Sequence, residues 1–142
     1  MAAELFRVAK PGGVVAMANY TQDGFFGRLG SIVAATGPPS LLPSPFLWAD
    51  PPTVGERFDG RADDVRVVIR SATFEFNSIH EGWDSLERAN GPLKALQQLS
   101  PPDAYADTRE RGQALMAELN RAEDGRLAIN WTYALVVATR AG

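Results

Sequence analysis

Three polar residues follow an apolar stretch near the start of the chain and are the first candidates for chemistry. Asn19, Tyr20 and Thr21 come directly after the run VVAMA at residues 14–18. A run that is apolar at every position predicts a strand covered on both faces. Ligands of open α/β sheets bind beyond the carboxyl ends of strands, where these side chains would lie. Alternatively, Asn19 and Thr21 close a turn while Tyr20 packs, and the sequence leaves both interpretations open.

A second group of candidates is aromatic and could form an apolar pocket for a lipid-like or aromatic molecule. Its members are Phe25, Phe26, Phe46, Trp48 and Trp83. Aromatic side chains also dominate protein cores, so packing is the competing interpretation for this group. His80 is of a type that transfers protons near neutral pH, but a lone histidine before a helix is more often a surface or capping residue.

The composition excludes several classes of function. The 142 residues include no cysteine and one histidine, which excludes thiolate catalysis and Cys- or His-rich metal sites. Seventeen acidic and fourteen basic residues give a net charge of −3 without a basic cluster, so no nucleic-acid partner is expected. No apolar run reaches the ~18–20 residues of a membrane span, and the first residues lack a signal-peptide layout. We therefore expect a soluble, cytoplasmic protein with no membrane partner.

Periodicity and turn residues place the candidates in an alternating α/β order. Strands are predicted at residues 14–18, 65–76 and 126–139. Helices are predicted at residues 2–9, 24–36, 51–59, 80–99 and 101–122, with a break in the fourth at Gly91-Pro92. Asp50 and Ser100 are expected to cap the helices that follow them.

Two segments carry more specific expectations. In the last predicted strand, alternate residues from Leu127 to Val137 should line one face. The proline-rich segment 37–52 holds the apolar residues Leu41, Leu42, Phe46, Leu47 and Trp48, which need a surface to pack against. Long ordered loops of this kind often serve as binding lids.

One long segment carries a resemblance to a known family. Residues 2–20, AAELFRVAKPGGVVAMANY, resemble the helix, turn and strand that enter strand five of class I S-adenosylmethionine-dependent methyltransferases, where E-x-x-R-V-L-K-P-G-G recurs. The pattern Y-x-L-V-V-A-x-R at residues 133–140 agrees with the closing strand of that fold. The chain thus resembles the C-terminal half of a methyltransferase of the small-molecule, ubiquinone-biosynthesis-like type.

The resemblance implies a particular fold. It is the C-terminal portion of a Rossmann-like methyltransferase, with about three strands, one of them antiparallel, and flanking helices. Its strands would run in the order five–seven–six. Residues 1–142 would then form a single partial domain without the N-terminal cofactor-binding half.

The resemblance also implies what such a chain does. The family holds S-adenosylmethionine with a glycine-rich turn and an acidic residue in its first half, and no G-x-G-x-x-G occurs here. We therefore expect an acceptor-side half whose segment after strand five lines the methyl-acceptor pocket. Methyl transfer needs the donor held in line with the acceptor, so neither cofactor binding nor catalysis is expected of this chain alone.

The strand at Val14–Ala18 would lose the neighbour that strand four provides in the family. Natural proteins seldom leave such an edge open, so we expect a homodimer, or a partner chain that covers this strand. The alternative is an oligomerising module, or one that binds a small apolar ligand, derived from the same fold.

Overall fold

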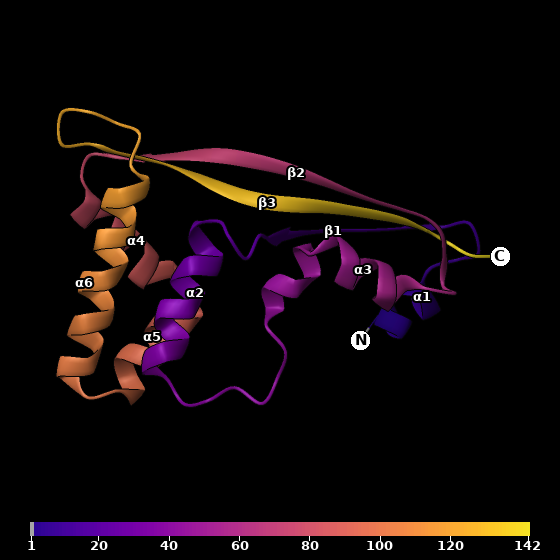
Figure 1. Cartoon of the computed structure of the whole chain (residues 1–142), viewed down its shortest axis with the longest axis horizontal. Helices are drawn as coiled ribbons and strands as arrows, with labels where there is room; N and C mark the ends of the chain where they lie inside the picture. Colours follow the sequence, from indigo (N-terminus) through magenta and orange to yellow (C-terminus); the bar gives the residue numbers. More distant parts are fainter. Residues whose placement is uncertain (1) are drawn as a thin grey trace. The chain divides into compact units, whose positions relative to one another are not determined.

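The computed structural model describes residues 2–142, which form an α/β fold of six α-helices, one 3₁₀ helix and three strands (Figure 1). In chain order the elements are α1 (Ala2–Val8), β1 (Val14–Tyr20), α2 (Phe25–Thr36), η1 (Pro45–Ala49), α3 (Pro51–Phe58), β2 (Ala62–Phe76), α4 (Ile79–Ala89), α5 (Gly91–Leu99), α6 (Pro102–Leu119) and β3 (Leu127–Arg140). None of the helices in these residues has the length and hydrophobicity needed to cross a lipid bilayer.

Local sequence signals explain several helix boundaries. The Asp50 side chain accepts a hydrogen bond from the Thr53 amide and begins α3, as predicted. Asn90 caps α5 in the same way by accepting from Leu93, and this cap produces the predicted break after α4. The prediction for Ser100 is wrong, because Pro101 occupies the N-cap position of α6 and makes no side-chain capping bond.

The three strands form one antiparallel sheet in the order β1–β3–β2, with β3 between the other two (Figure 1). Val14 pairs with Thr139 and Tyr20 pairs with Tyr133, so β1 is matched along its whole length. The turn before β1 needs Gly12, whose φ of 71° lies in the left-handed region that favours glycine. The order corresponds to the five–seven–six arrangement expected above.

The expectation that the apolar run of β1 is covered on both faces is wrong. Val15 is buried and Met17 is half-buried, whereas Ala16 and Ala18 are exposed and Val14 is 65% exposed. Burial thus alternates along the strand, as in a sheet with one covered face. Two residues on the open face, Ala16 and Ala18, are alanines. They are not polar, so the sequence does not mark this face as open, and their side chains are too small to remove much apolar surface from water when covered.

The described residues divide into two compact units. The first comprises residues 2–24, 43–71 and 132–142, and the second comprises residues 25–42 and 72–131. Both β2 and β3 contribute residues to each unit, which is why neither unit is a continuous segment of the chain.

The core of the first unit joins the sheet to helices on its covered face. Ala134, Val136 and Ala138 of β3 are almost completely buried against this core. The rings of Phe6 in α1 and Phe58 in α3 meet edge to face, with centroids 4.9 Å apart. Small β3 side chains allow these helices to approach the sheet closely.

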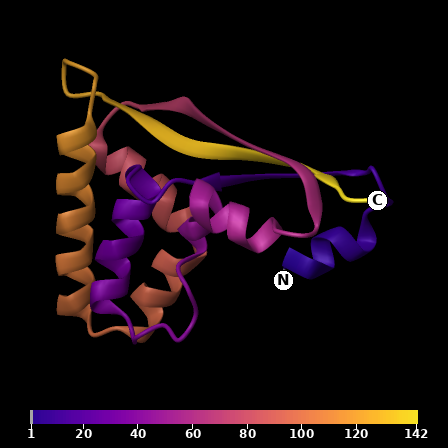
Figure 2. The ribbon, with the colours of Figure 1, turned by 45° about the vertical axis from the view of Figure 1, so that its right-hand side comes forward.

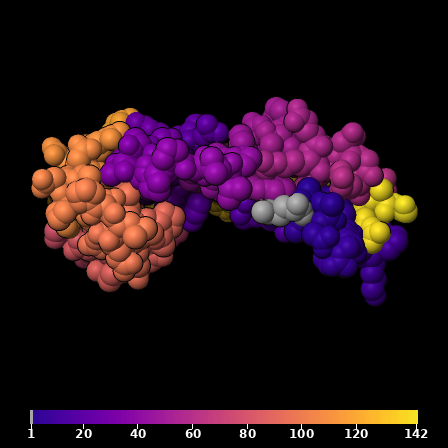
Figure 3. All heavy atoms as spheres, turned by 90° about the horizontal axis from the view of Figure 1, so that it is seen from below, coloured from indigo at the N-terminus to yellow at the C-terminus, as the bar shows by residue number. Residues whose placement is uncertain are grey.

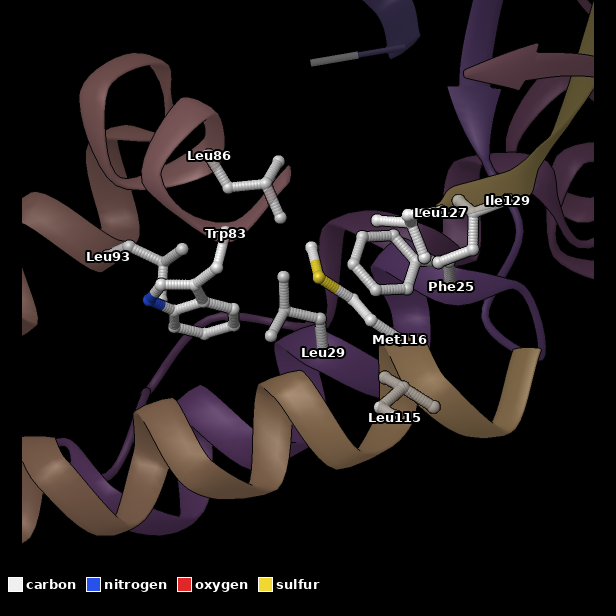
Figure 4. Close-up of a cluster of buried hydrophobic side chains, with 9 residues drawn as sticks. All are labelled: Phe25, Leu29, Trp83, Leu86, Leu93, Leu115, Met116, Leu127 and Ile129. Atoms are coloured by element: carbon white, nitrogen blue, oxygen red, sulfur yellow. The ribbon is translucent and has the colours of Figure 1, made fainter. Parts of the chain in front are cut away.

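The core of the second unit is built from the remaining helices and the first residues of β3. Helices α2 and α6 lie side by side in Figures 1 and 2 and are in contact along their length. Figure 4 shows the buried side chains of this core: Phe25, Leu29, Trp83, Leu86, Leu93, Leu115, Met116, Leu127 and Ile129. Removing a side chain of this size from water stabilises the fold by about 1.5–3 kcal/mol.

Two further expectations fail. Leu127 and Ile129 are buried as predicted, but the buried positions of β3 then change to Ala134, Val136 and Ala138, and Leu135 is 39% exposed. In the proline-rich segment, Leu41 and Leu42 are exposed rather than packed. The remaining apolar residues of that segment, Phe46, Leu47 and Trp48, are half-buried.

Candidate functional site

The predicted polar residues lie at the carboxyl end of β1, but Asn19 and Tyr20 are the last two residues of the strand and only Thr21 follows it. The Asn19 amide nitrogen lies 3.4 Å from the Trp48 carbonyl oxygen, a long hydrogen bond between β1 and η1. Thr21 is buried, and its backbone N–H donates to the Thr132 carbonyl at 3.1 Å. Tyr20 is partly exposed at the end of the strand. Thr21 therefore closes the strand pair, whereas Asn19 faces the helical layer.

Trp48 has a cationic neighbour that the sequence did not reveal. The guanidinium carbon of Arg57 lies 4.2 Å from the centroid of the Trp48 ring, in a cation–π contact. Arg57 Nη1 is buried and has no hydrogen-bond acceptor among the described residues. A buried donor of this kind can donate a hydrogen bond to an oxygen atom of a ligand or a water. Nothing in the spacing of Trp48 and Arg57 in the sequence signals this contact.

Asp50 lies between η1 and α3 and has a structural role. One carboxylate oxygen accepts from the Thr53 amide at 3.0 Å and from the Thr53 hydroxyl at 2.5 Å. These two hydrogen bonds lower the pKa of Asp50 below its usual range. Asp50 is therefore an ionised helix cap and is poorly suited to act as a base.

The aromatic candidates fall in both units. Phe46 and Trp48 belong to the first unit, and Phe25, Phe26 and Trp83 belong to the second. Phe25 and Trp83 lie inside the second core, with 1% and 0% of their surfaces exposed. Phe26 is half-buried, and its ring meets that of Trp131 edge-on with centroids 4.7 Å apart. Packing is the role that the structure gives Phe25 and Trp83, and the acceptor pocket remains a prediction.

A carboxylate inside the second unit holds two of its large side chains. The Trp83 indole N–H and the Tyr105 hydroxyl both donate to Oε1 of Glu87, each at 2.6 Å. Burial raises the pKa of Tyr105, and the hydrogen bond to Glu87 raises it further, while nearby Arg109 acts in the opposite direction. The sequence gives no sign of this network, because Glu87 looks like an ordinary helix-surface acid.

The lone histidine lies on the surface of the second unit. His80 Nε2 is 3.4 Å from Oδ2 of Asp84, and 71% of its side chain is exposed. Asp84 also accepts a hydrogen bond from Arg109 at 2.9 Å. Ser78, not His80, caps α4. Among residues 2–142, no cluster of three or more acidic or histidine side chains is placed to hold a metal ion.

Neither the models of known protein families nor the curated proteins include a match to this chain. The best-supported site lies at the carboxyl end of the edge strand β1, where Asn19 reaches the Trp48 carbonyl of η1 and Arg57 lies over the Trp48 ring.

Proposed function

We propose that this chain is the acceptor-side half of an S-adenosylmethionine-dependent methyltransferase-like fold. It assembles with a partner chain through β1 and does not transfer methyl groups by itself. The K-P-G-G turn, the edge position of β1 and the central position of antiparallel β3 support this proposal. The proposed Rossmann-like ancestry follows from the sequence resemblance together with this strand order. No glycine-rich G-x-G-x-x-G turn follows any of the three strands.

The observation that carries the assembly proposal is the edge of β1. Because β3 pairs with one side of β1, the other side is an edge of the described sheet. The strand VVAMANY contains no charged residue and no proline, the two devices by which proteins most often block such an edge. An edge without these devices is a template for another strand.

We propose a second copy of the chain as the partner. Two β1 strands can pair antiparallel about a two-fold axis at Met17, which sets Val14 of each copy opposite Tyr20 of the other. No like charges meet in this register, since the strand carries none. The pairing would also join the open faces of the two sheets, where Val14 and Leu135 are exposed.

Light scattering on the purified chain at micromolar concentration tests assembly. We expect twice the mass of one chain, whereas the mass of one chain would contradict the proposal. A mass that exceeds one chain only when a different protein is present would replace the second copy with a heterologous partner.

Calorimetric titration with S-adenosylmethionine tests the claim that this chain does not bind the cofactor by itself. We expect no saturable heat from this chain, because the described residues offer no turn that brings backbone amides close to the cofactor. Stoichiometric binding in the micromolar range would contradict the assignment of this chain to the acceptor side alone.

A further inference from the structure

Three arginines line one hollow of the first unit. Arg7 comes from the last turn of α1, Arg61 from the turn before β2, and Arg140 from the end of β3. The hollow has a volume of about 300 Å³ and is also lined by Phe6 and Gly60. Figure 3 shows the indigo atoms of α1 beside the yellow atoms at the end of the chain, with the magenta α3 region next to them. Residues distant in sequence thus meet around one hollow that three arginines line.

The backbone that carries two of these arginines is fixed by hydrogen bonds. The Arg61 amide donates to the Phe58 carbonyl at 2.9 Å, which closes the turn after α3. The Arg61 carbonyl accepts from the Ala141 amide at 2.9 Å, so this turn is tied to the residue after Arg140. Arg140 pairs with Gly13 through its own amide at 2.8 Å. The two side chains therefore start from rigid positions, which lowers the entropic cost of binding a ligand.

Among the described residues, only one of these three guanidinium groups has a carboxylate partner. Arg7 pairs with Glu4 at 2.7 Å, but both side chains are about two-thirds exposed and such pairs are weak. Arg61 and Arg140 take part in no ion pair within residues 2–142. Their guanidinium groups donate to the carbonyl oxygens of Asp59 and Ala9 instead. Each guanidinium has five N–H donors, so most donors remain available.

We propose that this hollow binds a small phosphate-bearing molecule. Guanidinium groups bind phosphate and carboxylate oxygens through paired, charge-assisted hydrogen bonds. A carboxylate presents two oxygens in one plane and fits one guanidinium fork. A phosphate presents three oxygens and a charge near −2, which matches donors that arrive from three segments of the chain. The volume lies at the lower end of small-molecule sites, which are about 300–1,000 Å³.

Titration with inorganic pyrophosphate, followed by amide chemical shifts in NMR, tests this site. We expect saturable shifts of the Gly60, Arg61 and Ala141 amides, which line the hollow. Binding should weaken as salt is raised, because the site is open to solvent. If no saturable shifts appear at pyrophosphate concentrations up to ~10 mM, the affinity is very weak and the proposal is overturned. Tighter binding of citrate than of pyrophosphate would overturn the choice of phosphate over carboxylate.

Two arginine variants separate a built site from general surface charge. Arg61→Gln should weaken pyrophosphate binding by about tenfold or more, because it removes one set of charge-assisted hydrogen bonds. Arg66→Gln is the matched control, since Arg66 is exposed on β2 and already paired with Asp64 at 2.9 Å. The control should change binding by less than about twofold. Equal losses in both variants would show diffuse attraction to basic residues and would overturn the proposed site.

Discussion

The indole ring of Trp83 fills the space that a side chain at Gly112 would need. A Cβ atom at residue 112 would lie 2.0 Å from Cζ3 and 2.3 Å from Cη2 of Trp83. Real Cβ atoms do not approach other atoms so closely, and the fully buried Trp83 has little room to move. The glycine in the middle of α6 is thus explained by the packing of α4 against α6.

Gly112→Ala should lower the free energy of unfolding by about 1–3 kcal/mol, because overpacking displaces the Trp83 ring. The loss should appear even though alanine is favoured over glycine in a helix by about 1 kcal/mol. Urea unfolding followed by circular dichroism measures it. Gly55→Ala is the control, because Gly55 lies in α3 with no atom within 4 Å of its Cβ position. The control should keep or raise the stability, and equal losses in both variants would contradict this account of Gly112.

Glu87→Ala should destabilise the second unit by about 2–4 kcal/mol, because it leaves the Trp83 and Tyr105 donors without their shared acceptor. Glu87→Gln should cost less, since the amide oxygen can still accept one or both hydrogen bonds. Denaturant unfolding of both variants measures the difference. Glu110→Ala, at an exposed position of α6, should change the stability by no more than about 0.5 kcal/mol. A Glu87→Ala variant as stable as this control would contradict the role of the network.

Stability should fall as the pH rises above about 10, the ordinary pKa of tyrosine. The fold raises the pKa of Tyr105 through burial and the bond to Glu87, so the unfolded chain releases this proton at lower pH than the folded chain. The stability contributed by neutral Tyr105 is therefore complete below the unfolded pKa and is lost as the pH rises toward the folded pKa. Unfolding at pH 8 and pH 11 should show a smaller decrease for Tyr105→Phe than for the unmodified chain. Equal decreases would contradict the assignment to Tyr105.

Local sequence rules predicted most elements of the fold. Periodicity placed α2 and both long strands, and Gly91-Pro92 marked the break between α4 and α5. These features depend on neighbouring residues, such as the Asp50 side chain that caps the helix immediately after it. Rules of this local kind need no knowledge of the tertiary structure.

The failed predictions concern features that distant residues decide. Burial in β3 changes from Leu127 and Ile129 to Ala134 and Val136 because the strand passes from the core of one unit to that of the other. A single alternating pattern cannot describe a strand with two cores. Likewise, the Val14–Ala18 run contains no polar residue to show that one face is open.

The candidate site was predictable only in part. The sequence placed Asn19, Tyr20 and Thr21 near the end of β1, but it ended the strand at Ala18, whereas the strand continues to Tyr20. The Arg57 contact with Trp48 and the two donors to Glu87 depend on tertiary packing, so no sequence spacing indicated them. The three arginines around the hollow are separated by 54 and 79 positions in the chain, the differences between residues 7, 61 and 140.

The most direct test of assembly through β1 compares three proteins by light scattering at the same micromolar concentration. Ala16→Lys places a charge on an exposed residue of the β1 edge strand, and Ala117→Lys makes the same change on the exposed surface of α6. Circular dichroism should confirm that both variants fold. We predict twice the mass of one chain for the unmodified protein and for Ala117→Lys, and the mass of one chain for Ala16→Lys. One common mass for all three proteins would contradict the proposed interface.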